Sequence, residues 1–348
     1  MKAPIEDAST RGAWLIAGSQ PAITLLAPLI AARRKVQRVV ELEDGAEALL
    51  THPADVLPRG TEAVLVVGPR RVSPRRGLPG LFLMDAQKRR VPAGWLPDVG
   101  ADLATYAHAA ARVLTRVAAA GMKAAVKHAV PPRQSGVGGP VVVLGQWEDR
   151  FLRVGLRTAR WFERHPGEWP AFHWTADRIS RENMLRGLAD CGPALAMYFG
   201  HGRPRGWAGY HGVRREHFAD RTWAEPMGAL LALCCENASR WRTAMSFAET
   251  LAMRGVFAGG LAAVTKTRHE HNRRLGPMLC EALTNSSSGT LGELVLALPA
   301  EEWTDTPYRF IGDPAAALIG AENAAARAAD VFAPAPDAAL PPWAELSA

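Results

Sequence analysis

Two short segments of this sequence carry reactive side chains directly after an apolar run. The first is Gly200-His201-Gly202, and the second is Cys234-Cys235-Glu236-Asn237. A cysteine thiolate attacks carbonyl carbons, and a histidine within hydrogen-bond reach takes the thiol proton and lowers its pKa. The two segments therefore predict nucleophilic catalysis with His201 as the base and Cys235 as the nucleophile.

The glycines next to the histidine have a predicted role of their own. Gly202 has no side chain, so its backbone N–H can approach a substrate carbonyl, and Gly200 supports the same turn. Together with the N–H of Cys235, the N–H of Gly202 would form an oxyanion hole, in which each donor is worth about 2.7–4 kcal/mol of barrier.

The two adjacent cysteines should face opposite sides, because side chains alternate along a strand. Only one of Cys234 and Cys235 can then meet His201. The residues alone leave another interpretation open, since free cysteine is among the most buried residue types and both thiols could be small core side chains.

The elements that would position these residues alternate along the chain between strand-like and helix-like segments. The predicted strands are Trp14–Ala17, Val36–Leu42, Ala63–Val67, Gly80–Met84, Val141–Gly145, Ala171–Trp174, Ala194–Phe199, Gly228–Cys235, Val256–Val264 and Tyr308–Ile311. The predicted helices are Pro21–Arg34, Gly45–Leu50, Asp102–Ala120, Asp149–Arg164, Arg178–Asp190, Ser246–Arg254, Leu275–Leu283 and Leu291–Leu298. This order predicts an α/β fold with a mostly parallel sheet and helices on both faces. Ligands bind beyond the carboxyl ends of such strands, so His201 and Cys235 should face one crevice.

The length of 348 residues predicts about two domains. Pro131–Pro140 is the strongest linker signal, since it is rich in proline and glycine. We expect a smaller, non-catalytic α/β subdomain over residues 1–135, a catalytic domain over 136–330, and a Pro/Ala-rich tail over 331–348.

The composition is that of an ordinary globular protein, with 48% hydrophobic and 22% charged residues. The net charge of +7 is mild for this length, and no nucleic-acid module accompanies it. Four cysteines are too few for a disulfide scaffold, which favours a reducing compartment and a cytoplasmic location. Ser19-Gln20-Pro21 and Pro28 interrupt the apolar stretch Ala13–Ala32, so we expect neither a signal peptide nor a membrane span there.

Four features, in order, resemble the caspase-like cysteine peptidases, and most closely the gingipain-like family and its bacterial caspase relatives. They are Gly200-His201-Gly202, Cys235-Glu236-Asn237, the stretch from Ser246–Glu249 to Gly259–Val264, and Tyr308–Pro314. The resemblance covers about Val141 to Leu318 and extends more weakly to the first half. It implies a three-layer αβα caspase-like fold and a cysteine endopeptidase with a His201–Cys235 dyad. In that family a small residue precedes the nucleophile and a polar pair follows it, which favours Cys235 over Cys234.

The resemblance also implies a protein or peptide substrate, no cofactor, and room for a regulatory protein partner. An acidic residue in the specificity pocket would select a basic side chain, and Glu148, Asp149 and Glu236 are the candidates. We therefore hypothesise cleavage after Arg or Lys. An equally good interpretation of Glu148 and Asp149 is that they stabilise the N-terminus of the following helix.

Other substrate contacts are expected from loops at the strand ends. The loop of residues 203–223 is long and contains Trp207, an aromatic candidate for a substrate wall. Thr265 and Thr267 follow the next strand, and the resemblance implies that this rim aligns an extended substrate backbone.

Three alternatives to a peptidase were weighed. A metal site would use residues among His201, His211, His217, Cys234, Cys235, His269 and His271, but their spacing matches no zinc pattern. A dinucleotide site would need a G-x-G-x-x-G turn, which neither half contains. The serious alternative is a caspase-like scaffold or protein-binding module with weak or no catalysis, because a fold does not by itself give a function.

Overall fold

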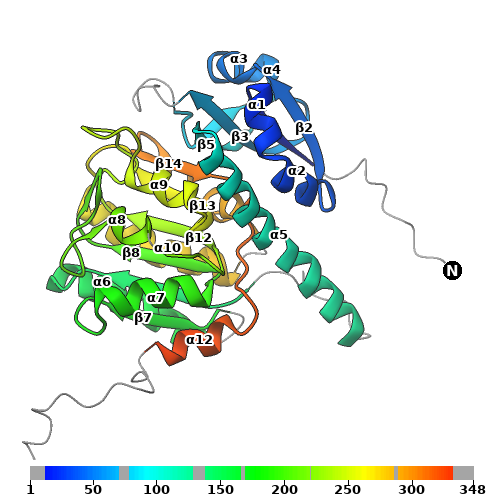
Figure 1. Ribbon diagram of the computed structural model, residues 1–348. Helices are drawn as coiled ribbons and strands as arrows, with labels where there is room; N and C mark the ends of the chain where they lie inside the picture. The colour runs from blue at the N-terminus through cyan, green and yellow to red at the C-terminus, as the bar shows by residue number, and fades with distance from the viewer. Residues whose placement is uncertain are drawn as a thin grey trace, which may run out of the picture.

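One sheet of eleven strands runs through the whole molecule, with helices on both of its faces (Figure 1). The structure, a computed structural model, describes residues 12–69, 78–127, 138–165, 169–219, 221–285 and 289–331. The strand order is β2-β1-β3-β5-β14-β13-β12-β8-β6-β7, and β4 pairs with β5 outside this path. The predicted α/β class with a mostly parallel sheet is therefore confirmed.

The N-terminal half supplies five strands and five helices. The strands are β1 (Ala13–Gly18), β2 (Arg38–Glu43), β3 (Thr61–Pro69), β4 (Phe82–Met84) and β5 (Arg90–Asp98). The helices are α1 (Gln20–Leu25), α2 (Ala27–Arg34), α3 (Ala46–Thr51), α4 (Pro53–Val56) and α5 (Ala101–Lys127). Of these elements, the sequence analysis missed β5 and the short helix α4.

The C-terminal half continues the sheet. Its sheet strands are β6 (Val141–Gly145), β7 (Ala171–Thr175), β8 (Leu195–Phe199), β12 (Met227–Leu233), β13 (Phe257–Ala263) and β14 (Tyr308–Gly312). Its helices are α6 (Asp149–Arg164), α7 (Arg181–Cys191), α8 (Glu216–Ala219), α9 (Phe247–Met253), α10 (His269–Asn285), α11 (Leu291–Leu296), the 3-10 helix η2 (Ala300–Trp303) and α12 (Ala324–Asp330). A separate three-stranded sheet consists of β9 (Gly202–Arg203), β10 (Gly206–Trp207) and β11 (Val213–Arg214).

The strand direction reverses once within the main sheet. β13 and β14 pair antiparallel, whereas all the other neighbours along the strand order are parallel. Strands β1, β2, β3, β5 and β14 therefore end at one edge of the sheet, and β6, β7, β8, β12 and β13 end at the opposite edge. This reversal is a structural reason to expect no catalytic residue from the strand ends of the N-terminal half.

The helices form two outer layers. One buried core cluster joins the sheet to α1, α2, α5, α7 and α9, and two others join its opposite face to α3, α6, α10 and α11. This is the three-layer arrangement that the resemblance implied. Among the described residues, no helix is both long enough and apolar enough to cross a membrane.

The two halves share the sheet through β5 and β14, where Phe310 pairs with Gly94 and Ile311 with Trp95. The expected boundary at residues 135–136 lies outside the described residues, as do most of the Pro131–Pro140 linker and the tail from 332 onward. The division into two domains stays a prediction.

Asp313 connects the N-terminal half to the end of β14. Its carboxylate accepts a hydrogen bond from Nε1 of Trp14 at 3.0 Å and forms an ion pair with Arg33. The side chains of this ion pair are only 4% and 1% exposed. The hydroxyl of Tyr106 accepts the backbone N–H of Asp313 at 2.8 Å and donates to the carbonyl of Ala258 at 2.6 Å. Buried polar groups held this way fix one relative position of α2, α5 and β14.

Removing Arg33 should destabilise the protein strongly, because Asp313 would keep a buried charge without its partner. Breaking a buried ion pair in this way costs about 3–5 kcal/mol. We expect a loss of this size in the free energy of unfolding of Arg33→Ala, measured by urea denaturation. The matched control is Arg34→Ala, because Arg34 is 61% exposed and pairs with Glu41 at the surface, where an ion pair is worth about 0–1 kcal/mol. Equal losses in the two variants would contradict this role of Asp313.

Candidate active site

Strands β8 and β12 bring the two reactive segments to one edge of the sheet. The strands pair in parallel, with Phe199 opposite Leu233. His201 lies two residues after Phe199, and Cys235 lies two residues after Leu233. The two residues therefore follow their strands at the same level. Because neighbouring strands are about 4.8 Å apart, this register brings the two segments close together.

Side-chain alternation directs both residues toward the same face. The side chains of β8 and β12 that share a core cluster with α6 and α10 are the odd-numbered ones: Leu195, Met197, Phe199, Ala229, Leu231 and Leu233. His201 and Cys235 continue these two series. We therefore expect both side chains on the face that α6 and α10 cover.

Contacts at the ends of α6 and α10 agree with that expectation. The His201 ring meets Phe151 of α6 edge-on, with ring centroids 5.1 Å apart. Phe151 in turn meets His269, the first residue of α10, at 5.3 Å. The Cys235 sulfur lies 3.3 Å from the backbone nitrogen of Thr267, two residues before His269. Both reactive groups therefore border the surface where α6 and α10 begin.

Gly202 allows the two segments to touch through their backbones. A Cβ atom added to Gly202 would lie 2.2 Å from the carbonyl oxygen of Cys235 and 2.6 Å from the sulfur of Cys234. No side chain fits in this space, so glycine is required for the close approach. The backbone N–H of Cys235 has no hydrogen-bond partner among the described residues, which leaves it free to bind an oxyanion.

The two adjacent thiols have different surroundings. Cys234 is 1% exposed, its sulfur lies 3.0 Å from Oδ1 of Asn237, and burial raises its pKa well above the usual value. Cys235 is half-buried, and its sulfur accepts the N–H of Thr267. Cys235 is therefore the more accessible of the two thiols.

Both the backbone N–H and the ring of His201 contact polar side chains. Its N–H donates to Oε1 of Gln146 at 2.9 Å. Its Nε2 lies 2.7 Å from Nη2 of Arg150 and 3.3 Å from Oε1 of Glu148. Arginine only donates hydrogen bonds, so in this arrangement Nε2 accepts and a neutral ring carries its proton on Nδ1. When Nε2 carries a proton instead, the Glu148 carboxylate is the group that can accept a hydrogen bond from it.

Asn237 joins the cysteine turn to the β9–β10 hairpin. Its Nδ2 donates to the carbonyls of Arg203 at 2.9 Å and Gly206 at 3.2 Å. Its Oδ1 accepts from Nε1 of Trp207 at 2.6 Å. The side chain is fully buried with its hydrogen-bonding groups occupied, so it fixes the position of the hairpin that begins next to His201.

A second buried amide, Asn272 of α10, supports the cysteine from the other side. Its Nδ2 donates to the Leu233 carbonyl and to Oγ1 of Thr267, both at 3.0 Å, and its Oδ1 accepts from the hydroxyl of Tyr308 at 2.7 Å. Asn272 therefore links the end of β12 to the residue that contacts the Cys235 sulfur.

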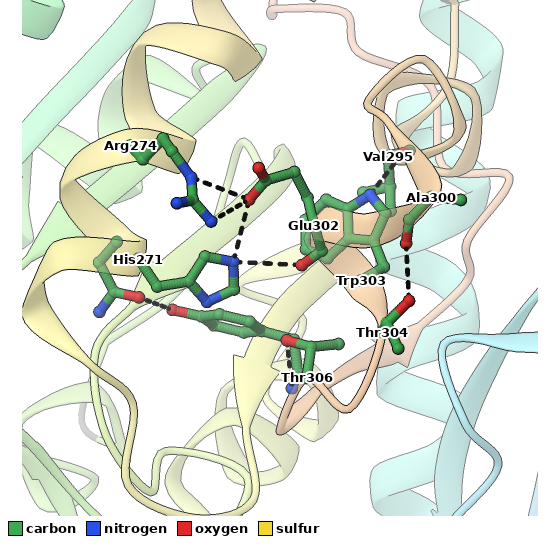
Figure 2. A network of polar contacts seen from close by, with 10 residues as sticks. His271, Arg274, Val295, Ala300, Glu302, Trp303, Thr304 and Thr306 are labelled. Carbon is green, nitrogen blue, oxygen red and sulfur yellow. Dashed lines mark hydrogen bonds and ion pairs between the residues drawn. The ribbon is translucent and has the colours of Figure 1, made fainter.

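The loop that leads to Tyr308 is fixed against α10 by Glu302. Figure 2 shows the Glu302 carboxylate between Arg274, 2.8 Å away, and His271, 3.5 Å away. The His271 Nε2 also lies 3.1 Å from the Glu302 carbonyl. Burial lowers the pKa of His271, which favours a neutral ring at neutral pH. This network orders the segment that carries Tyr308 toward Asn272.

The predicted substrate contacts separate into different environments. Glu148 lies beside His201, as described above. Asp149 is 77% exposed and pairs with Arg153 in the first turn of α6, in agreement with the helix-terminus interpretation. Glu236 is half-buried, has a positive φ of 58° and forms no ion pair within the described residues. Its backbone N–H donates to the carbonyl of Thr265 at 3.1 Å.

Trp207 occupies a different position from the expected substrate wall. It is 3% exposed, stacks on Tyr198 with centroids 4.2 Å apart, and donates to Asn237. The indole therefore positions the hairpin from within the core. The aromatic residues at the surface near the site are instead Trp147, 41% exposed, and His211, which stack at 5.1 Å.

Sequence reasoning assigned no role to several residues of the site, namely Gln146, Arg150, Phe151, Asn237 and Asn272. The carboxyl-end rule could have identified Gln146, because it follows β6 and Gly145 pairs with Phe199. Phe151 and Asn272 lie on amphipathic helices, where the sequence gives no signal that separates them from core residues.

No metal site accompanies the candidate dyad in the part of the chain that the structure describes: no three His, Cys, Asp or Glu side chains gather there in a metal-binding group.

Comparison with known proteins finds a matching family model and similar solved structures. Residues 164–319 match the model of peptidase family C25, and no curated protein matches the chain. The structure is similar to the crystal structure of gingipain R, an Arg-specific cysteine proteinase, with a TM-score of 0.60 and 15% sequence identity over 91% of this chain and 80% of that chain. It also aligns with Saccharomyces cerevisiae separase in complex with securin, with a TM-score of 0.47 and 13% identity over 73% of this chain and 16% of that chain.

The family match and the fold agree with the resemblance seen in the sequence. The fold is the caspase-like α/β fold of the gingipains, and the family is one of cysteine-type peptidases, which are hydrolases with protein or peptide substrates.

Replacing Gly202 should impair catalysis by separating the two backbones. In Gly202→Ala the new Cβ would clash with the carbonyl oxygen of Cys235. That oxygen belongs to the backbone, so the clash can be relieved only by moving one of the two backbones. A displacement of about 1 Å at an active site costs about 100-fold in rate, and we expect kcat/KM against fluorogenic peptides to fall by this factor. The control is Gly80→Ala, whose Cβ would lie 3.4 Å from its nearest neighbour. Unchanged activity in Gly202→Ala would show that the close approach is not required.

Proposed function

We propose that this chain is a cysteine endopeptidase with Cys235 as nucleophile and His201 as general base, because residues 164–319 match the model of peptidase family C25. The observation that carries the proposal is the shared register of β8 and β12, from which side-chain alternation predicts His201 and Cys235 on one face at one edge of the sheet. The contacts of His201 with Phe151 and of Cys235 with Thr267 support it independently.

The reaction would proceed through an acyl-enzyme. His201 takes the Cys235 thiol proton, and the sulfur attacks the scissile carbonyl carbon to form a tetrahedral oxyanion. The C–N bond then breaks, and the leaving amine receives the proton from the imidazolium. A water molecule, deprotonated by the neutral imidazole, hydrolyses the thioester and restores the thiol. The N–H groups of Gly202 and Cys235 are the proposed oxyanion donors.

Glu148 and Arg150 would act on His201 in its two protonation states. Arg150 suits the neutral ring, because it can donate to Nε2. Glu148 suits a ring with a proton on Nε2, because a carboxylate accepts a hydrogen bond from that N–H. In this account Glu148 is a positioning residue rather than a pocket residue. The other ring nitrogen, Nδ1, forms no hydrogen bond within the described residues. It can take the Cys235 thiol proton in the tautomer whose proton lies on Nε2, where Glu148 is the acceptor.

The dyad is tested by the reactivity of the thiol. At a pH of about 6 an ordinary thiol with a pKa near 8.5 is almost fully protonated, whereas a thiol paired with an imidazolium is alkylated rapidly. We expect iodoacetamide to label Cys235 first, as located by peptide mass spectrometry. The buried thiols Cys191, Cys234 and Cys280 serve as internal references.

In His201→Ala the labelling of Cys235 at this pH should slow at least about tenfold, and peptide cleavage should be lost. The matched control is His108→Ala, an exposed histidine on α5. Labelling of Cys235 that is as slow as that of an ordinary thiol, and unaffected by His201→Ala, would instead support the scaffold interpretation.

We also propose that cleavage follows a basic residue and that Glu236 selects it. Of the three acidic candidates, Glu148 and Asp149 have arginine partners. Glu236 directly follows the nucleophile, and its carboxylate forms no ion pair within the described residues. Gingipain R, an Arg-specific cysteine proteinase with a similar structure, supports the same preference.

A positional peptide library tests this specificity. The wild type should prefer Arg or Lys before the scissile bond, and Glu236→Gln should lose about 10–100-fold in kcat/KM on those substrates, since a hydrogen bond to a charged group is worth about 1.5–3 kcal/mol. Asp149→Asn is the control and should change kcat/KM less than about twofold, because Asp149 is exposed. A wild-type preference for Asp, Asn or apolar residues would rule the hypothesis out.

A further inference from the structure

The small sheet β9–β10–β11 borders a groove of about 690 Å³ that is rich in arginine. The arginines that line it are Arg203, Arg205, Arg214, Arg215 and Arg242, and Trp241 lies among them. The only acidic side chain in the lining is Glu216. The groove is therefore strongly cationic in a chain whose charge is otherwise nearly balanced.

Most of this positive charge is not neutralised by the protein itself. Glu216 pairs with Arg215 at 2.9 Å. Within the described residues, no carboxylate forms an ion pair with Arg203, Arg205, Arg214 or Arg242. Several like charges along one concave surface repel one another and raise the local potential, which attracts anions.

Trp241 provides an apolar contact in the same groove. It is 67% exposed, and the guanidinium of Arg242 lies over its ring at 5.5 Å. The turn is ordered, because the Trp241 N–H donates to Oγ of Ser239 at 3.3 Å and Arg205 donates to the Arg242 carbonyl at 2.9 Å. Exposed Trp and Arg side chains on an ordered surface are the residue types that dominate binding energy at protein interfaces.

The groove is connected to the segments that carry the candidate dyad. Arg203 follows Gly202, and the segment Ser239–Arg242 follows the turn that carries Cys235. Asn237 bonds to the carbonyls of Arg203 and Gly206, which fixes the hairpin against the cysteine turn. A polypeptide held at Cys235 therefore has the groove next to it.

We propose that this groove binds an acidic segment of the polypeptide substrate, located outside the residues that flank the scissile bond. The inference rests on the proposed peptidase function, since it is the nearby cysteine site that makes a polypeptide the expected occupant. Arginine forks bind carboxylates in bidentate geometry, and a tryptophan favours contact with an apolar residue among the acidic ones. The preferred substrate would then combine a basic residue at the cleaved bond with an acidic stretch beside it.

Binding can be tested without catalysis by using Cys235→Ala in the full chain. We expect a peptide with four Glu or Asp residues and one Leu to bind at least about tenfold more tightly than its Gln/Asn counterpart, as measured by calorimetry and by Trp241 fluorescence. Binding should weaken as salt is raised, because exposed charges are screened. A failure of the dyad itself would leave this result intact, so the two proposals fail separately.

The groove variant is Arg205→Gln, Arg214→Gln and Arg242→Gln combined, and the control combines Arg153→Gln and Arg273→Gln on exposed helix surfaces. The groove variant should lose the preference for the acidic peptide and should cleave a short peptide that has Arg before the scissile bond but no acidic residue at the wild-type rate, while the control keeps both properties. Equal binding of acidic and neutral peptides, or an unchanged preference in the groove variant, would overturn the proposal. Tighter binding of a single-stranded oligonucleotide than of a peptide of equal charge would also overturn it.

Discussion

The parallel pairing of β8 with β12 is the constraint on which the rest of the site depends. Each residue of a strand has a fixed partner and a fixed face, so one pair in register determines the placement of the residues that follow. Phe199 opposite Leu233 sets His201 and Cys235 level with each other and on one side of the sheet. A slip of one residue in either strand would turn one of the two side chains to the opposite face. The expected proximity of His201 and Cys235 is thus a consequence of the strand register.

Two buried amides convert that register into a fixed arrangement. Asn237 ties the cysteine turn to the β9–β10 hairpin, and Asn272 ties the end of β12 to Thr267. Both are buried, so each unmade hydrogen bond would cost free energy, and the satisfied network favours a single geometry. Glycine at position 202 is needed in the same place, because only a residue without Cβ lets the two backbones meet.

The sequence predicted the strands that carry the site because their apolar runs are short and end abruptly at Gly200 and Cys234. It did not predict β5, since Pro92 and Pro97 argue against a strand. In the structure β5 pairs with β4 through residues 90–92, with β3 through residues 93–98 and with β14 only at Gly94 and Trp95, so both prolines lie outside its pairing with β14. Without β5, nothing in the sequence indicated that the strand direction reverses between β13 and β14. Because of this reversal, the N-terminal strands end at the opposite edge of the sheet. Contacts such as those of Glu148 with His201 and of Trp207 with Asn237 depend on tertiary packing, and local sequence contains no signal for them.

The most direct test of the account is the crystal structure of the protein treated with a peptidyl chloromethyl ketone that carries Arg next to the reactive group. The account predicts a covalent bond to Sγ of Cys235, the ligand oxygen about 3 Å from the backbone nitrogen of Gly202, and the His201 ring in contact with the modified sulfur. A ligand bound to Cys234, or a modified Cys235 whose sulfur lies out of reach of the imidazole, would contradict it.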